Sequence, residues 1–77
     1  RRDQVFFGAS VTYARASDDA EVTITIVGVD EAEAEAGRIS WVAPVARALL
    51  GARVGDVRRL RTPAGVEEIE VVGISYP

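Results

Sequence analysis

The chain is rich in carboxylates and hydroxyls but has no side chain that could act as their partner in catalysis. Its 77 residues include 12 Asp and Glu, and neither His nor Cys. All nine basic residues are Arg, so a Ser, Thr or Tyr nucleophile would have no imidazole, thiolate or Lys amine as its base. Glycosidase-like chemistry by two carboxylates needs a cleft, for which so small a domain leaves little room. We therefore expect no catalytic residue and a protein that is not an enzyme.

The acids are densest at residues 30–35, where Glu alternates with Ala after an initial Asp. Converging carboxylates bind Ca²⁺ or Mg²⁺, but this run lacks the Asp/Asn ladder, central Gly and closing Glu of an EF-hand loop. We interpret it as a solvated loop or a single helical turn. No metal site and no cofactor are expected.

The arginines form a modest cluster at Arg53, Arg58, Arg59 and Arg61. In a strand, Arg59 and Arg61 would face one way and Arg58 the other. An exposed strand edge protected from pairing explains them, with contact to an acidic partner or RNA as the alternative. The net charge of −3 and pI near 4.8 argue against a broad phosphate-binding surface, so we expect nucleic-acid contact to be weak or indirect.

Hydrophobic periodicity predicts the elements that must position these residues. It favours strands over residues 5–13, 21–29, 38–42, 56–62 and 66–76, a helix over 44–50, and a turn at 62–65. Phase changes suggest bulges at Gly8, within residues 56–62 and around Val72-Gly73. The fold class is α+β, with an antiparallel or mixed five-stranded sheet wrapped around one short helix. We expect one domain over residues 1–77.

The helix is marked at both ends. Pro44 suits a first helical position, and Gly51 suits the left-handed residue that follows a helix. Val45, Ala46, Leu49 and Leu50 form its apolar side, with Arg47 turned outward. So short a helix needs a sheet to hold it.

The corner before the helix, Val42-Ala43-Pro44, is apolar, and we expect its tip to be exposed. Exposed apolar corners often mark a partner contact. Trp41 precedes it and is the only tryptophan. It is either a core residue on the same face as Ile39 or an interface anchor, because Trp is enriched in binding hot spots.

Six segments in this order resemble the C-terminal domain of the Gre transcription elongation factors, and the resemblance is closer to GreB than to GreA. They are residues 6–11, 26–32, 37–40, 44–51, 54–56 and 62–65. The resemblance implies an FKBP-like fold and docking at the rim of the secondary channel of bacterial RNA polymerase. In the family, acidic residues at the tip of a separate N-terminal coiled coil assist cleavage of backtracked RNA by the polymerase.

The resemblance also implies which residues dock. The family's corner carries a polar residue, Ser and Pro; here only Pro44 is retained, and the missing Ser removes an N-cap oxygen worth about 1 kcal/mol. The expected docking residues are Ser40, Trp41, Val42, Ala43, Pro44 and Arg47.

Two alternatives remain: a regulator of nucleoside diphosphate kinase from the same superfamily, which often has an apolar residue and Ala before that Pro, and an FKBP-type prolyl isomerase. The chain begins Arg-Arg and has no Met, so we expect a fragment without the coiled coil. The lack of Cys fits a cytoplasmic protein, and no stretch is apolar enough to span a membrane. The sequence does not predict an oligomeric state.

Overall fold

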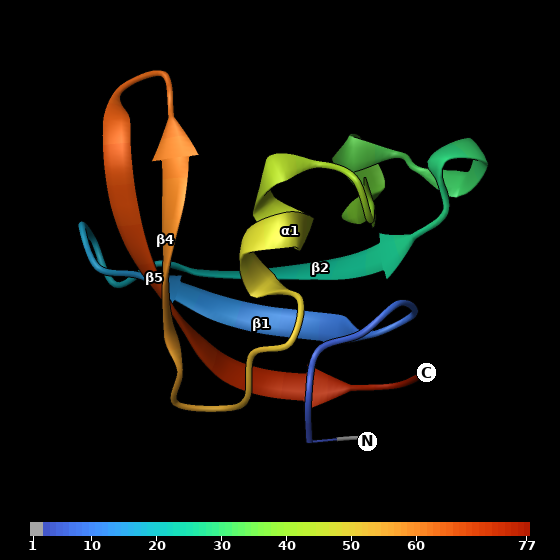
Figure 1. The fold of residues 1–77 in the computed structure, drawn as a ribbon, viewed down its shortest axis with the longest axis horizontal. Helices are drawn as coiled ribbons and strands as arrows, with labels where there is room; N and C mark the ends of the chain where they lie inside the picture. Colours follow the sequence, from blue (N-terminus) through green and yellow to red (C-terminus); the bar gives the residue numbers. More distant parts are fainter. Residues whose placement is uncertain (1–2) are drawn as a thin grey trace.

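The protein, seen in a computed structural model that describes residues 3–77, is a five-stranded sheet curled around one short helix (Figure 1). The strands are β1 (Ser10–Arg15), β2 (Glu21–Val27), β3 (Arg38–Ser40), β4 (Val57–Thr62) and β5 (Gly65–Ser75). The helix is α1 (Pro44–Leu49), and two 3-10 turns, η1 (Val29–Glu31) and η2 (Ala34–Ala36), precede β3. The expected domain over residues 1–77 includes residues 1–2, which lie outside the described range.

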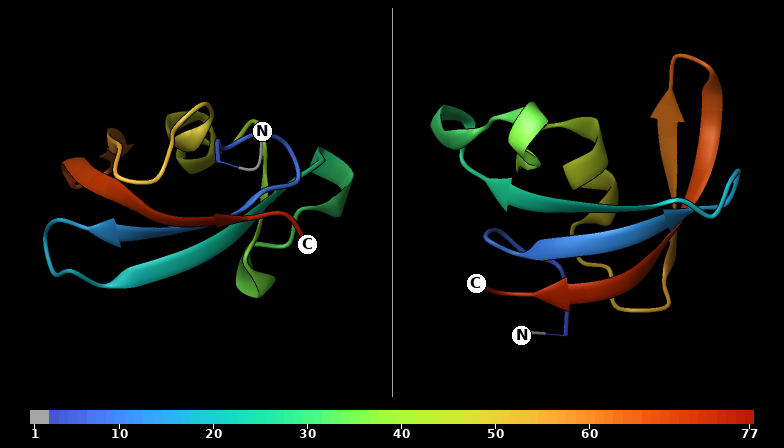
Figure 2. Two further views of the ribbon diagram at one scale, coloured as in Figure 1. Left: turned by 90° about the horizontal axis from the view of Figure 1, so that it is seen from below. Right: turned by 180° about the vertical axis from the view of Figure 1, so that it is seen from behind.

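The strand order is β3-β2-β1-β5-β4. All neighbours are antiparallel except β2 and β3, which are parallel. The expected mixed sheet around a short helix is therefore confirmed. The right-hand view of Figure 2 shows the β4–β5 hairpin projecting beyond the other strands.

Alternation along β2 explains how the sheet obtains a buried face. Ile24 and Ile26 are buried while Thr23 is exposed, as the period of two predicts. On β1, Val11 and Tyr13 are buried in the same way. The remaining core comes from the N-terminal segment, α1, the loop after it and β5, namely Val5, Ala9, Ala46, Leu49, Ala52, Ile69 and Val71.

α1 begins at Pro44, where the sequence predicted, and ends at Leu49, one residue before the predicted end. Pro44 occupies the first turn, and Ala43 at the N-cap has no side-chain hydrogen bond to the helix. The Leu50 N–H donates to the Ala46 carbonyl at 2.9 Å, and Gly51 follows with a φ of +86°. Leu49 is fully buried, so the sheet supplies the stability that so short a helix lacks.

Several expected strand boundaries were wrong. Residues 5–9 are not a strand, because Gly8 turns the chain with a φ of +89° and the Val5 N–H donates instead to Ala52. β2 and β3 end two residues early, at Val27 and Ser40.

The two bulge predictions in the C-terminal half had opposite outcomes. The register of β4 with β5 runs without a shift, so a bulge within residues 56–62 was wrong. The bulge near Val72 is confirmed, because Thr12 pairs with Gly73 while Tyr13 pairs with Val71.

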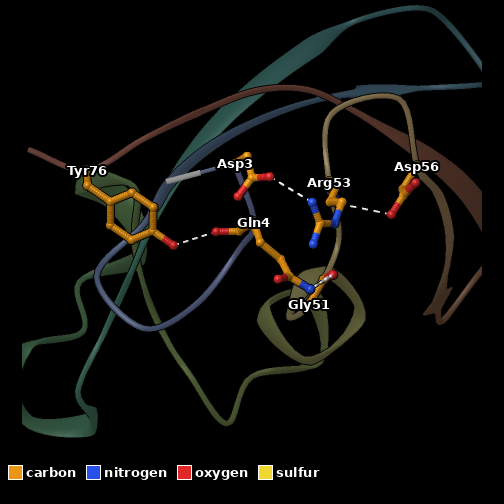
Figure 3. Close-up of polar contacts among 6 residues, drawn as sticks. All are labelled: Asp3, Gln4, Gly51, Arg53, Asp56 and Tyr76. Carbon is orange, nitrogen blue, oxygen red and sulfur yellow. Dashed lines mark hydrogen bonds and ion pairs between the residues drawn. The ribbon is translucent and has the colours of Figure 1, made fainter. Parts of the chain in front are cut away.

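Polar contacts tie the N-terminal segment to the chain's far end (Figure 3). The Tyr76 hydroxyl donates to the Gln4 carbonyl at 2.5 Å and accepts from the Phe6 N–H at 3.0 Å. Gln4 Nε2 donates to the Gly51 carbonyl at 2.8 Å, and Arg53 pairs with Asp3 at 2.7 Å. Residues 3–6 are thus held against the loop that follows α1.

Candidate docking site

The chain between β3 and α1 is a turn fixed by backbone hydrogen bonds. The Trp41 N–H donates to the Val27 carbonyl at the end of β2, at 2.9 Å. The Ala43 N–H donates to the Ser40 carbonyl at 2.9 Å, and Ser40 Oγ accepts from the Val42 N–H at 3.3 Å. Both the carbonyl and the hydroxyl oxygen of Ser40 therefore help to fix the corner.

The side chains beyond this turn are exposed. Trp41 is 48% and Val42 47% exposed, and Pro44 and Arg47 are also exposed, whereas Ala43 is half-buried. β3 ends before Trp41, so the alternation that placed Trp41 beside Ile39 no longer applies there. Core packing of Trp41 was wrong, and the expected exposure of the corner is confirmed.

Three of these side chains, together with that of Leu50, surround one shallow hollow. It measures about 350 Å³ and is lined by Trp41, Val42, Arg47 and Leu50. Leu50 was assigned only to the apolar side of the helix. Its spacing of three residues from Arg47 is the signal that places both on one helical face.

The hollow combines an apolar floor with an available cation. Among residues 3–77, Arg47 forms no ion pair, whereas Arg38 at the start of β3 is paired with Glu33 at 2.6 Å. Aromatic side chains and Arg are enriched at interface hot spots. The arrangement suits binding of a protein surface that offers an apolar side chain next to a carboxylate.

Two of the acidic residues before β3, Glu31 and Glu33, are engaged locally. Glu31 Oε1 accepts from the Gly28 N–H at 3.3 Å, and Glu33 pairs with Arg38. Within residues 3–77, no three Asp or Glu side chains lie close enough together to hold a metal ion. The segment is exposed, as the sequence predicted, but it forms two 3-10 turns rather than a loop or a single turn.

Among residues 3–77, the two side chains with shifted pKa values, Tyr13 and Asp18, belong to β1 and the β1–β2 connection rather than to the corner. Burial raises the pKa of the Tyr13 hydroxyl in β1. In the β1–β2 connection, a hydrogen bond from the Ala20 N–H lowers the pKa of the Asp18 carboxyl, and Arg15 lowers it further. Neither Tyr13 nor Asp18 is among the residues that line the hollow.

Comparison with known protein families shows which family the chain resembles. The family described as "Transcription elongation factor, GreA/GreB, C-term" matches residues 1–76. The chain belongs to this family. The GreA/GreB resemblance seen in the sequence is thereby confirmed.

Individual relatives agree. The chain is 50% identical to GreB of Neisseria meningitidis serogroup A over 74 residues, which is 96% of the chain and 45% of that protein. It is 49% identical to GreA of Syntrophotalea carbinolica, over 96% of the chain and 47% of that protein. The crystal structure of Thermus aquaticus Gfh1 superposes with a TM-score of 0.84 at 34% identity, covering 92% of the chain and 47% of that structure.

The chain thus spans just under half the length of these relatives. GreB and GreA relatives match at almost equal identity, so the preference for the GreB branch stays a prediction. The matching relatives are elongation factors, and neither the nucleoside-diphosphate-kinase regulator nor the prolyl isomerase gains support from them. No helix within residues 3–77 is long and apolar enough to cross a membrane.

Proposed function

We propose that this chain is the RNA-polymerase-docking domain of a Gre-type elongation factor, which helps to rescue backtracked or arrested bacterial polymerase. Docking uses Ser40, Trp41, Val42, Ala43, Pro44 and Arg47. The domain itself is not catalytic. A coiled coil in another part of the factor assists the polymerase's own RNA cleavage, and the site of action is the cytoplasm.

The observation that carries this proposal is the exposed pair Trp41 and Val42 beside Arg47. Monomeric domains usually bury a Trp more fully than this. Here the backbone bond from Trp41 to Val27 holds the residue at the surface. A fixed, exposed aromatic next to an unpaired cation supports binding of a protein partner, and family membership makes polymerase the partner to test.

The departure from the family's corner also has a physical consequence. Val42 replaces a polar residue and Ala43 replaces Ser, so the corner loses two hydrogen-bonding side chains and gains an apolar one. Docking should therefore depend on apolar contact more than on hydrogen bonds. Its affinity should fall only modestly as the salt concentration rises, because Arg47 is the one charged residue among the six docking residues.

The proposal is tested by competition between this chain and a full-length Gre factor for RNA polymerase. The double variant Val42→Asp, Pro44→Ala should compete at least tenfold less well, because it places a charge in the hollow and loosens the start of α1. Val54→Asp is the matched control, since Val54 is 58% exposed in the loop after α1. Equal competition by the double variant and the control would remove the corner from the interface.

A further inference from the structure

The free edge of β4 carries unused backbone groups. β4 is the outer strand of the sheet, and its ladder with β5 starts at Thr62 and Gly65 across a two-residue loop, where opposite residues exchange hydrogen bonds. Hydrogen-bonded and non-hydrogen-bonded pairs alternate along an antiparallel ladder. Val57, Arg59 and Arg61 therefore occupy non-hydrogen-bonded positions, and their N–H and C=O groups point away from β5.

Contacts on the other side of β5 agree with this assignment. Glu68 lies opposite Arg59, and its carbonyl accepts from the Ala16 N–H at 2.9 Å, on the β1 side. The backbone N–H of Val71, three residues further along β5, points toward the β4 side instead, because it donates to the carbonyl of Asp56 at 3.0 Å, just before β4 begins. Within the described residues 3–77, Arg59 thus has β5 on one side and no strand on the other.

The side chains at this edge are positively charged and available. Arg58 turns toward α1, where its Nη1 donates to the Ala48 carbonyl at 3.5 Å. Arg59 and Arg61 project from the opposite face and are exposed. Among residues 3–77, neither forms an ion pair or a side-chain hydrogen bond, although Glu68 stands opposite Arg59.

We propose that the β4 edge binds an extended acidic segment of a partner protein, which adds to the sheet as a further strand. The three free positions would supply main-chain hydrogen bonds. Acidic side chains at every second residue of the segment would meet Arg59 and Arg61 on the face away from α1. Glu68 and Glu70 lie one strand further, about 4.8 Å away, so the arginines are the nearer charges and dominate.

Charge decides against two other occupants. A second copy of this chain pairing through β4 would place arginines beside arginines, which is unfavourable for directly opposed like charges. A single RNA strand would use the arginines but not the backbone edge, and the chain's net charge of −3 weakens its attraction for phosphates. The edge is formed by β4, whereas the corner lies between β3 and α1.

The test uses a fluorescein-labelled decapeptide of alternating Glu and Val, with a Lys–Val peptide of equal length as the charge control. Binding is followed by anisotropy, and amide hydrogen exchange is measured on the unmodified chain. We expect the Glu–Val peptide to bind, the Lys–Val peptide not to bind, and exchange at Val57, Arg59 and Arg61 to slow. Unchanged exchange at these amides would overturn strand addition.

Paired substitutions at Arg59 separate charge from backbone. Arg59→Ala should weaken binding roughly two- to fivefold through the lost ion pair. Arg59→Pro loses the same charge and also the outward N–H, without breaking a bond to β5, so it should abolish binding. Equal affinity of the two variants, binding of oligouridine in preference to the peptide, or peptide-independent dimerisation would each refute the proposal.

Discussion

Replacing Trp41 by Ala should weaken polymerase docking by one to two orders of magnitude. A Trp side chain offers up to about 250 Å² of surface, and 48% of it is exposed here, which leaves roughly 120 Å² for a partner to cover. At about 25 cal/mol per Å², covering half to all of this area contributes roughly 1.5 to 3 kcal/mol. Since each 1.4 kcal/mol is about tenfold, we expect a loss of roughly 10- to 100-fold.

The assay is the concentration of chain that displaces half of a labelled full-length Gre factor from RNA polymerase. Trp41→Phe keeps most of the apolar area and should cost less than about tenfold. Both variants should retain the wild-type pattern of amide resonances, because β2 and not the indole fixes the backbone of Trp41. A loss below about threefold for Trp41→Ala, with the fold intact, would refute Trp41 as the anchor.

Three further predictions concern stability. Ala43→Ser should raise the free energy of unfolding by about 1 kcal/mol in urea titrations, because the new hydroxyl can cap α1, and no gain would show that the corner cannot accept a cap. Tyr76→Phe removes the hydrogen bonds to Gln4 and Phe6. It should lower the free energy of unfolding by about 1 to 3 kcal/mol and the melting temperature by several degrees. An unchanged melting temperature would mean that these bonds to the N-terminal segment do not stabilise the fold. Burial raises the pKa of the Tyr13 hydroxyl above its ordinary 10.0. Above pH 10 the unfolded chain therefore loses this proton before the folded chain does, and the free energy of unfolding falls as the pH rises. Tyr13→Phe should reduce this alkaline decline, and identical pH profiles of the variant and the wild type would contradict the prediction.

Local patterns in the sequence predicted the parts of the fold that local physics decides. The alternation of β2 depends on side chains within one strand, and the limits of α1 depend on the fixed φ of Pro44 and the positive φ of Gly51. The bulge at Val72 was visible as a change of phase in the apolar residues of β5. Each of these signals lies within a few residues of the feature that it predicts.

The sequence was a poor guide where contacts with distant segments determine the local structure. Apolar residues 5–9 read as a strand, but Val5 finds its partner in the loop after α1, about 47 residues away in sequence. For Trp41 the alternation left both core packing and an exposed anchor open, because the end of β3 at Ser40 is set by its pairing with β2. Leu50 joined the hollow only once the orientation of α1 on the sheet was known.

The most direct test of docking without catalysis is RNA cleavage in stalled, backtracked elongation complexes. The chain is titrated in the presence and in the absence of a full-length Gre factor. Alone, it should leave cleavage at the polymerase's basal rate; with the factor present, it should suppress the stimulated rate as it displaces the factor. Acceleration by the chain alone, or stimulated cleavage that is indifferent to excess chain, would contradict the assignment of this domain as a polymerase-docking module.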